Sequence, residues 1–373
     1  MIVVCGEPQI VLKMKNILGN FLASIFVLTF LSCGNAEDDV SFDINQRELG
    51  LGKEPDKCLG FDENELLLSI QDEFTTLPGK VSILFKVSDL AGNPISGLMA
   101  NQFTIYEQGR NDNCFNIISS SESQARISPN TQVFSNNTIL VLDLSNSVLE
   151  GSLEELKSAS SSFIGNVMPT PETDSFKMAI YWFDGEDELH LLNPLTSSAT
   201  ELMASVAAIT ADISNDPSTD LYGAVIKSTK IAEGYIKEIQ KGIGAASIVL
   251  FTDGTDQASR YTEAAALDAV NDANNNISFF TIGLGAEIDT EILVQIGKTA
   301  SVFAGNKEEL ETTFNQISQR VSEQANSFYL FEYCSPKRDG SGENNLVIQV
   351  TDGSLQGAVQ TKFSANGFIG GCE

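Results

Sequence analysis

The segment 138–142, Thr-Ile-Leu-Val-Leu, constrains the fold of this chain more than any other stretch. It is rich in β-branched and aliphatic residues and too short for a helix, so it predicts a strand buried on both faces at the centre of a parallel sheet. Asp143, Ser145 and Ser147 follow directly, where such a strand ends, and the pattern of 153–167 predicts a helix after them. Open α/β sheets place their ligand sites at that end of the strands.

Three oxygen donors at alternate positions of one loop can point at a single spot, which is how a small divalent cation is held. Two later segments supply further donors. Thr219 stands just before a helical pattern, and Asp253 and Gly254 follow a second buried strand predicted over 247–252. The sequence therefore offers hydroxyl and carboxylate oxygens in three separate loops.

Taken in order, Asp143-x-Ser145-x-Ser147, then Thr219, then Thr252-Asp253-Gly254 resemble the metal-ion-dependent adhesion site of the von Willebrand factor A domain family. The resemblance covers about residues 137–326, roughly half of the chain. It implies a metal, Mg²⁺ in the first place, with Mn²⁺ and Ca²⁺ also suited to oxygen ligands. It further implies that a Glu or Asp carboxylate of a partner protein completes the coordination. The metal-contacting residues that it implies are Asp143, Ser145, Ser147, Thr219 and Asp253.

Strand and helix patterns alternate from residue 137 onward, which predicts an α/β fold with a doubly wound, mostly parallel sheet flanked by helices. Crossovers in such sheets are right-handed in nearly all cases, so the usual strand order is expected. Further strands are predicted at 177–183, 277–283 and 301–303, and helices at 200–211, 221–240, 262–273, 290–297 and 308–324.

The regions on either side of this domain have β patterning. Short alternating segments run through 65–119, and the part from Phe85 to Gly109 resembles the small β-sandwich module that often precedes A domains in bacterial surface proteins. The tail after residue 326 is too short to bury a core by itself. We therefore expect it to complete a β-sandwich in which the A domain is inserted, with a free-standing C-terminal hairpin as the alternative. The predicted strands are 81–87, 103–107, 327–333, 346–350 and 358–363.

The amino terminus has the pattern of a processing signal. Lys13 and Lys15 form a basic region, and residues 17–31 are mostly apolar. The stretch 30–34, Phe-Leu-Ser-Cys-Gly, resembles a bacterial lipoprotein signal, which implies lipidation of Cys33. A cleaved secretion signal and an uncleaved anchor are the alternatives, although the apolar stretch is shorter than the ~20 residues of a spanning helix.

These patterns divide the chain into five parts, with either Met1 or Met14 as the start. We predict a signal peptide at 1–33, a flexible tether at 34–57, the first part of the β-sandwich at 58–130, the A domain at 131–326 and a C-terminal β segment at 327–373.

Four cysteines remain beyond the signal, namely Cys58, Cys114, Cys334 and Cys372. An even number in an exported chain predicts two disulfides, and all three possible connectivities stay open. No Cys-x-x-Cys pair occurs, so a zinc cluster of thiolates is not expected.

A formal net charge of −28 argues against partners that carry many negative charges. Nucleic acid and anionic membrane faces both require clusters of Lys and Arg. Membrane attachment is therefore expected only through the N-terminal lipid, and the chain is expected to be a monomer.

The Asp-x-Ser-x-Ser loop has two other interpretations. It can cap the following helix and satisfy backbone N–H groups without any metal, an interpretation that Thr219 and Asp253 make less favourable. It also has the spacing of an EF-hand loop with Glu154 at the twelfth position, but Val148 stands where that loop needs glycine. The EF-hand interpretation is therefore rejected.

Enzymatic interpretations have little support. The chain has one histidine, His190, with no nucleophile motif nearby, so a hydrogen-bonded structural histidine is expected. Residues 297–299, Gly-Lys-Thr, resemble part of a phosphate-binding loop, but Ile292 occupies the place of its first glycine. Four acids in one turn are expected to be solvated loop residues: Asp184, Glu186, Asp187 and Glu188.

The combined prediction is a non-enzymatic, exported lipoprotein anchored at the outer membrane or cell surface. It would bind a partner protein through a metal-bridged carboxylate, as in adhesion. A periplasmic scaffold or assembly factor is the main alternative, and a metal-dependent hydrolase is a third.

Overall fold

The computed structural model describes residues 49–109, 111–119, 125–128, 134–238, 243–338 and 342–372. The predicted signal peptide, with Cys33, and most of the predicted tether lie outside these residues. Within them, no helix has both the length and the apolar character needed to cross a membrane.

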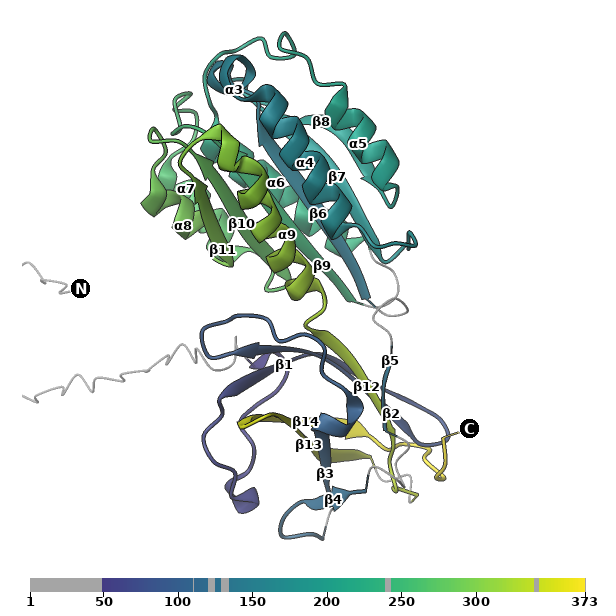
Figure 1. The fold of residues 1–373 in the computed structure, drawn as a ribbon. Coiled ribbons are helices and arrows are strands. Elements are labelled where there is room, and N and C mark those ends of the chain that lie inside the picture. The colour runs from purple at the N-terminus through teal and green to yellow at the C-terminus, as the bar shows by residue number, and fades with distance from the viewer. Residues whose placement is uncertain are drawn as a thin grey trace, which may run out of the picture. The chain divides into compact units, whose positions relative to one another are not determined.

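A six-stranded sheet forms the centre of an α/β domain that spans residues 134–325 (Figure 1). Five strands are parallel, and the edge strand β8 is antiparallel to β7. In spatial order the strands are β11 (Ala300–Ala304), β10 (Ile277–Leu284), β9 (Ile243–Thr252), β6 (Phe134–Asp143), β7 (Phe176–Phe183) and β8 (His190–Thr196). When the strands are numbered along this domain and read from β8 to β11, the order is 3-2-1-4-5-6, which is that of a doubly wound sheet. The predicted fold class is confirmed.

Helices cover both faces of this sheet (Figure 1). One face packs against α3 (Asn146–Gly151), α4 (Leu153–Val167), α5 (Ala199–Ala207) and α9 (Leu310–Ala325). The other packs against α6 (Leu221–Lys237), α7 (Glu263–Asp272) and α8 (Thr290–Ile296). Successive residues of β6 point to opposite faces, Leu140 and Leu142 into the first core and Ile139 and Val141 into the second. Burial on both faces explains why this strand has an uninterrupted apolar sequence.

Three of these helices begin at side chains that accept hydrogen bonds from the first turn. Asp220 accepts from the Gly223 N–H, Thr262 from Ala265, and Asp289 from the first turn of α8. Such caps satisfy backbone donors that have no partner within the helix. The local sequence therefore determines where α6, α7 and α8 begin.

Two four-stranded antiparallel sheets form a β-sandwich around a second core. Each sheet combines strands from before and after the α/β domain, because β12 pairs with β2 and β13 pairs with β3. The C-terminal strands therefore do not form a free-standing hairpin. One sheet has the order β1 (Leu66–Thr76), β2 (Lys80–Asp89), β12 (Phe328–Cys334) and β5 (Arg126–Ser128). The other has the order β14 (Leu355–Ser364), β13 (Glu343–Asp352), β3 (Phe103–Gln108) and β4 (Asn116–Ile118). Short 3₁₀ helices lie at Lys57–Leu59, Ala100–Gln102 and Lys307–Glu309.

The end of the predicted tether is part of this sandwich. Leu49 is buried in the sandwich core, and Lys53 forms a β-bridge with Gln360 of β14. The flexible segment predicted to run to residue 57 is therefore wrong for residues 49–57. The packing of Leu49 was not indicated by the sequence, because it is one of few apolar residues in a polar, acidic stretch.

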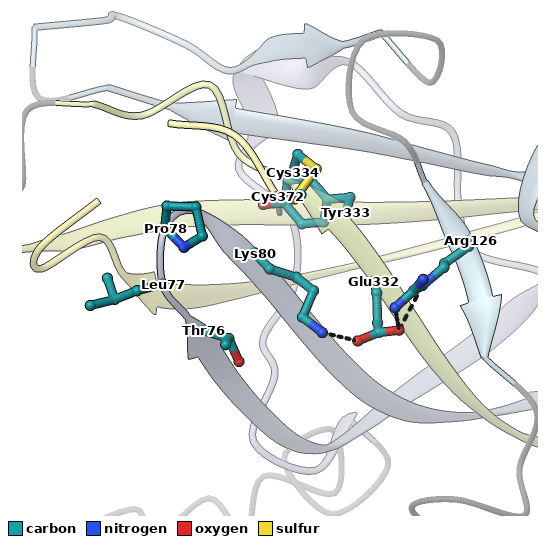
Figure 2. A pocket seen from close by; sticks show the side chains of 9 residues that line it. All are labelled: Thr76, Leu77, Pro78, Lys80, Arg126, Glu332, Tyr333, Cys334 and Cys372. Atoms are coloured by element: carbon teal, nitrogen blue, oxygen red, sulfur yellow. Dashed lines mark hydrogen bonds and ion pairs between the residues drawn. A yellow bond between two sulfur atoms is a disulfide. The ribbon is translucent and has the colours of Figure 1, made fainter. Parts of the chain in front are cut away.

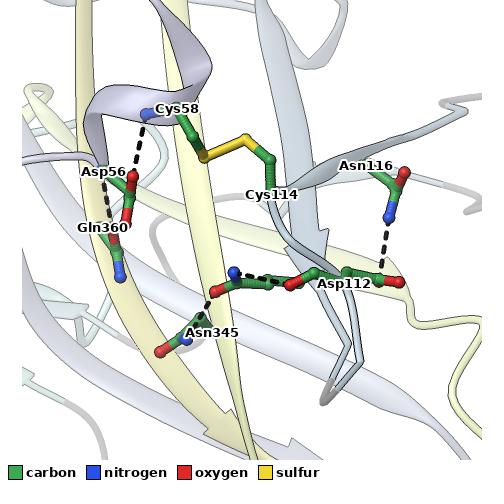
Figure 3. Close-up of a disulfide and its surroundings, with 8 residues drawn as sticks. Asp56, Cys58, Asp112, Cys114, Asn116, Asn345 and Gln360 are labelled. Atoms are coloured by element: carbon green, nitrogen blue, oxygen red, sulfur yellow. Dashed lines mark hydrogen bonds between the residues drawn. A yellow bond between two sulfur atoms is a disulfide. The ribbon is translucent and has the colours of Figure 1, made fainter.

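The two disulfides lie within the sandwich and join Cys58 to Cys114 and Cys334 to Cys372. Figure 3 shows the first of them beside Asp56, whose carboxylate accepts a hydrogen bond from the Cys58 N–H at 2.9 Å. Figure 2 shows the second beside a pocket in which the buried Glu332 forms an ion pair with Lys80, the two charged atoms being 2.8 Å apart.

The edge strand β8 was not predicted from the sequence. Its residues 190–196 contain Pro194, and only Asn193 is buried within it. Proline cannot donate to a strand ladder and is tolerated at the edge of a sheet, so the usual sequence signal is absent. His190 is consequently the first residue of a strand that the sequence did not indicate.

A buried acid joins the two sheets of the sandwich. The Tyr333 hydroxyl of β12 donates a hydrogen bond to Oε1 of Glu107 on β3, at 2.9 Å. Both side chains are buried, and burial raises the pKa of the Glu107 carboxyl above its ordinary value. The folded protein thus holds this proton more tightly than the unfolded chain does. By linkage, Glu107 lowers the free energy of unfolding as the pH rises through its unfolded and then its folded pKa.

We expect Glu107→Gln to gain stability relative to the wild type as the pH rises from acidic to neutral, because glutamine keeps the bond from Tyr333 without a buried charge. Urea unfolding of both proteins across that pH range measures the difference. Glu63→Gln, at an exposed position, is the control. A difference independent of pH would contradict the assignment of a raised pKa.

Candidate metal site at the carboxyl edge of the sheet

The two central strands of the α/β domain end side by side. β6 and β9 are parallel neighbours, with Leu142 paired to Phe251. The chain first winds outward from β6 and later from β9 in the opposite direction, so their carboxyl ends flank the switch point of the sheet, where doubly wound folds bind ligands. Asp143 and Thr252, the next residues, are joined by a hydrogen bond from Thr252 Oγ1 to Asp143 Oδ2 at 2.6 Å.

The two serines extend this contact to the second aspartate. The hydroxyl oxygens of Ser145 and Ser147 lie 3.3 Å apart, and Ser147 donates a hydrogen bond to Asp253 Oδ1 at 2.9 Å. The Asp143 carboxylate also accepts a hydrogen bond from the Ser145 N–H at 2.9 Å. Four of the five predicted site residues are therefore joined by hydrogen bonds and oxygen–oxygen contacts.

The fifth residue, Thr219, lies against the loop that follows Asp253. Its backbone carbonyl accepts hydrogen bonds from the N–H groups of Gln257 and Ala258, at 2.9 and 3.0 Å. A side-chain carbon on Gly254 would be only 3.9 Å from the Thr219 hydroxyl oxygen. Thr219 is 2 % exposed. The structure thus brings all three predicted loops together, although no described hydrogen bond joins the Thr219 hydroxyl to either aspartate.

Hydrogen bonds donated by backbone N–H groups hold the loops against one another. The Asn146 N–H donates to the carbonyl of Pro217 at 3.2 Å, and the Tyr222 N–H donates to Asp256 Oδ1 at 3.1 Å. The segment that carries Thr219 is therefore held to the first loop on one side and to the third loop on the other.

One carboxylate of this site is buried and the other is partly buried, and neither has a basic partner in the part of the chain that the structure describes. Asp143 is 0 % exposed, and burial raises its pKa to about 7, with a further contribution from the charge of Asp253. Burial also raises the pKa of Asp253. Among the described residues, no lysine, arginine or histidine forms an ion pair with either carboxylate. Buried charges are normally paired or bound to metals, so these hard oxygen donors fit a small divalent cation.

The serine side chains do not cap the following helix. Ser145 is the N-cap residue of α3, but its side chain makes no capping hydrogen bond. Asp143 does support the loop by accepting from the Ser145 N–H, as Asp residues do in turns. Capping therefore explains the carboxylate of Asp143 in part and does not explain the two serine hydroxyls, which contact each other and Asp253.

Sequence reasoning missed two features of this edge. Thr252 was noted only as part of the strand end, although its hydroxyl orients Asp143. Asp184 was expected to be a solvated loop acid, and this was wrong because it is 0 % exposed. Asp187 and Glu188 are exposed as expected. The position of Asp184 directly after β7, at the same edge as Asp143, is the signal that could have identified it.

Comparison with known proteins identifies the class of the domain. Residues 137–320 match the family model of the von Willebrand factor type A domain, and this part of the chain is such a domain. We refer to the α/β domain, residues 134–325, as the A domain from here on. No curated protein matches the chain.

Several solved structures resemble parts of the chain. The conserved hypothetical protein BatB of Bacteroides thetaiotaomicron is 20 % identical, over 51 % of this chain and 99 % of its own, with a TM-score of 0.41. A von Willebrand factor type A protein of Catenulispora acidiphila is 12 % identical, over 82 % and 76 %, with a TM-score of 0.43. The manganese-loaded TRAP protein of Plasmodium vivax is 13 % identical, over 65 % and 98 %, with a TM-score of 0.42.

The bond from Thr252 to Asp143 leads to a prediction about cation affinity. Thr252→Val keeps the side-chain shape but removes the donor that orients the carboxylate. Loss of such a supporting bond typically weakens metal binding about 10- to 100-fold. We expect this loss for Mg²⁺, measured by the rise in melting temperature with added MgCl₂. Thr252→Ser, which retains the hydroxyl, should respond like the wild type, and an unchanged response of the valine variant would refute the role.

Proposed function

We propose that the A domain binds a divalent cation and, through it, an acidic side chain of a partner protein. The proposed metal-contacting residues are Asp143, Ser145, Ser147, Thr219 and Asp253. The observation that carries the proposal is the convergence of two carboxylates and three hydroxyl groups at the switch point of the sheet, in a part of the chain where the structure describes no basic residue paired with them.

Mg²⁺ is the proposed ion, because it prefers oxygen donors and retains several non-protein ligands. Mn²⁺ and Ca²⁺ also suit such donors. Three of the five proposed donors are neutral hydroxyls, so at most two carboxylates of the protein would offset the ion's charge. When bound, the ion would supply a positive centre that attracts a carboxylate.

The net charge of the chain increases the dependence of partner binding on a cation. With a formal net charge of −28, the protein repels an acidic partner at long range. Salt screens this repulsion beyond a Debye length of roughly 8 Å, whereas an ion held at the contact acts at shorter distance. We therefore propose that partner binding requires the cation rather than being merely strengthened by it.

The proposed function is adhesion or protein recognition by a monomer, as opposed to passive scaffolding. The two functions differ in how removal of the metal should affect partner binding. A scaffold that uses the A domain structurally keeps its partners in a chelator, whereas a metal-bridged contact loses them.

We expect Mg²⁺-dependent capture of partners from extracellular-matrix or cell-envelope extract. The capture should be lost in EDTA, which removes the ion, and in Asp143→Ala, which removes a carboxylate that would hold it. Ser147→Ala is a second variant with a smaller change to the core, and Asp268→Ala, exposed on α7, is the control. Recovery of the same partners with and without Mg²⁺ would favour the scaffold function instead.

We also propose that the protein is exported and attached to the cell envelope by a lipid on Cys33, at the outer membrane or the cell surface. The support is the basic, apolar and Cys-Gly sequence of residues 13–34. These residues lie outside those that the structure describes.

Cys33→Ser should abolish incorporation of labelled palmitate when the protein is expressed in a bacterium that processes lipoproteins. Cys5→Ser, a cysteine ahead of the basic region, is the matched control and should remain labelled. Labelling that persists in Cys33→Ser would exclude lipidation at this cysteine.

A further inference from the structure

A second group of side chains of the types that bind metals lies near the first site in the A domain. It consists of Asp184 and Glu186, in the turn after β7, and His190, at the start of β8. One ligand atom of each residue lies within 4.8 Å of the other two. His190 Nε2 is 3.9 Å from Asp184 Oδ1 and 3.5 Å from Glu186 Oε2. None of these residues belongs to the proposed adhesion site.

The imidazole of His190 is held in place, but one of its nitrogens has no hydrogen-bond partner among the described residues. Its ring stacks on the indole of Trp182, with centroids 4.0 Å apart and planes 14° from parallel. Nε2 is buried and has no hydrogen-bond partner among the described residues, although the side chain as a whole is 19 % exposed. A buried nitrogen without a partner is costly. The prediction of a hydrogen-bonded structural histidine is therefore wrong for Nε2. The absence of a hydrogen bond at this nitrogen points to a missing ligand.

The carboxylate of Asp184 is oriented by bonds of the kind that support metal ligands. Its Oδ1 accepts from the Glu186 N–H at 2.8 Å, and its Oδ2 accepts from the Ser214 hydroxyl at 2.7 Å. Ligating carboxylates in metal sites are typically fixed by such outer hydrogen bonds. Asp184 is thus held with one oxygen directed to the same small space as His190 Nε2.

We propose that Asp184, Glu186 and His190 bind a divalent transition metal, with Zn²⁺ as the simplest occupant. A nitrogen donor with two carboxylates suits Zn²⁺ or Mn²⁺, whereas the all-oxygen adhesion site suits Mg²⁺. Donors at 2.0–2.2 Å from a tetrahedral metal lie roughly 3.3–3.6 Å from one another, so the observed separations require only small movements. Three protein ligands leave a fourth position open.

An ion at this second site would also restrain the loop that carries Thr219. The Asp184 carbonyl accepts a hydrogen bond from the Asp220 N–H at 2.8 Å, and Ser214 bonds to the Asp184 carboxylate. A side-chain carbon on Gly185 would lie 2.0 Å from the Ser218 hydroxyl, so the loop is packed directly onto this turn. The two sites share this loop but no ligand.

The chain carries its own reporter for this site. Trp182 is the only tryptophan, and it is stacked on His190, so intrinsic tryptophan fluorescence reports on this cluster. We expect Zn²⁺, added to the full chain in excess Mg²⁺, to change this fluorescence in a saturable manner. Equilibrium dialysis should find one zinc per chain bound with the same concentration dependence.

Two variants test the ligands, and a third separates this site from the adhesion site. His190→Gln should lose the fluorescence response and the bound zinc, and Glu186→Gln, which changes a half-buried side chain, should weaken both about 10-fold or more. Asp143→Asn should retain both, so failure of the adhesion proposal would leave this one standing. Circular dichroism confirms that each variant is folded.

The proposal is overturned if Zn²⁺ leaves the fluorescence of the wild type unchanged, or if His190→Gln binds zinc as the wild type does. It is also overturned if the fluorescence follows pH alone and is insensitive to added metal. That result would show a protonated imidazole between two carboxylates, an ion-pair cluster without a metal.

Discussion

The parallel pairing of β6 with β9 is the constraint on which the rest of this A domain depends. It places Asp143 beside Thr252 although 109 positions separate them along the chain, and a hydrogen bond of 2.6 Å joins the two side chains. The strands can lie at the centre only because both are apolar on both faces. Burial of the strands therefore also buries Asp143 and Thr252 at their ends, and it raises the pKa values of the carboxyl groups of Asp143 and Asp253.

Such a site lowers the stability of the folded domain. Two acids held close together without a basic partner cost free energy, and a protein selected only for folding would replace them with apolar residues. The hydroxyls of Ser147 and Thr252 each donate to one of the carboxylates, which offsets part of the cost. The remaining cost supports the proposal that these residues are metal ligands, and it implies that binding of a cation would raise the stability of the domain.

Most elements of the fold could be predicted, because continuous apolar runs such as 138–142 and 247–252 depend on residue type alone. The site residues could be proposed for the same reason, through their order and spacing. The burial of Asp184 was missed, since only its position after a strand indicates it and its hydrogen bond from Ser214 depends on a loop that the chain forms later. The pairing of Cys58 with Cys114 likewise depends on which strands meet, and β8 was missed because Pro194 hides an edge strand.

The sandwich determines how the A domain is tethered. The chain leaves the sandwich after β5 and returns in β12, and these two strands are hydrogen-bonded neighbours, with Ser128 paired to Leu330. The A domain is thus attached by two covalent links that enter adjacent strands. A mechanical load on the A domain would be divided between both links, and a protease that cuts one of them would leave the domain attached by the other.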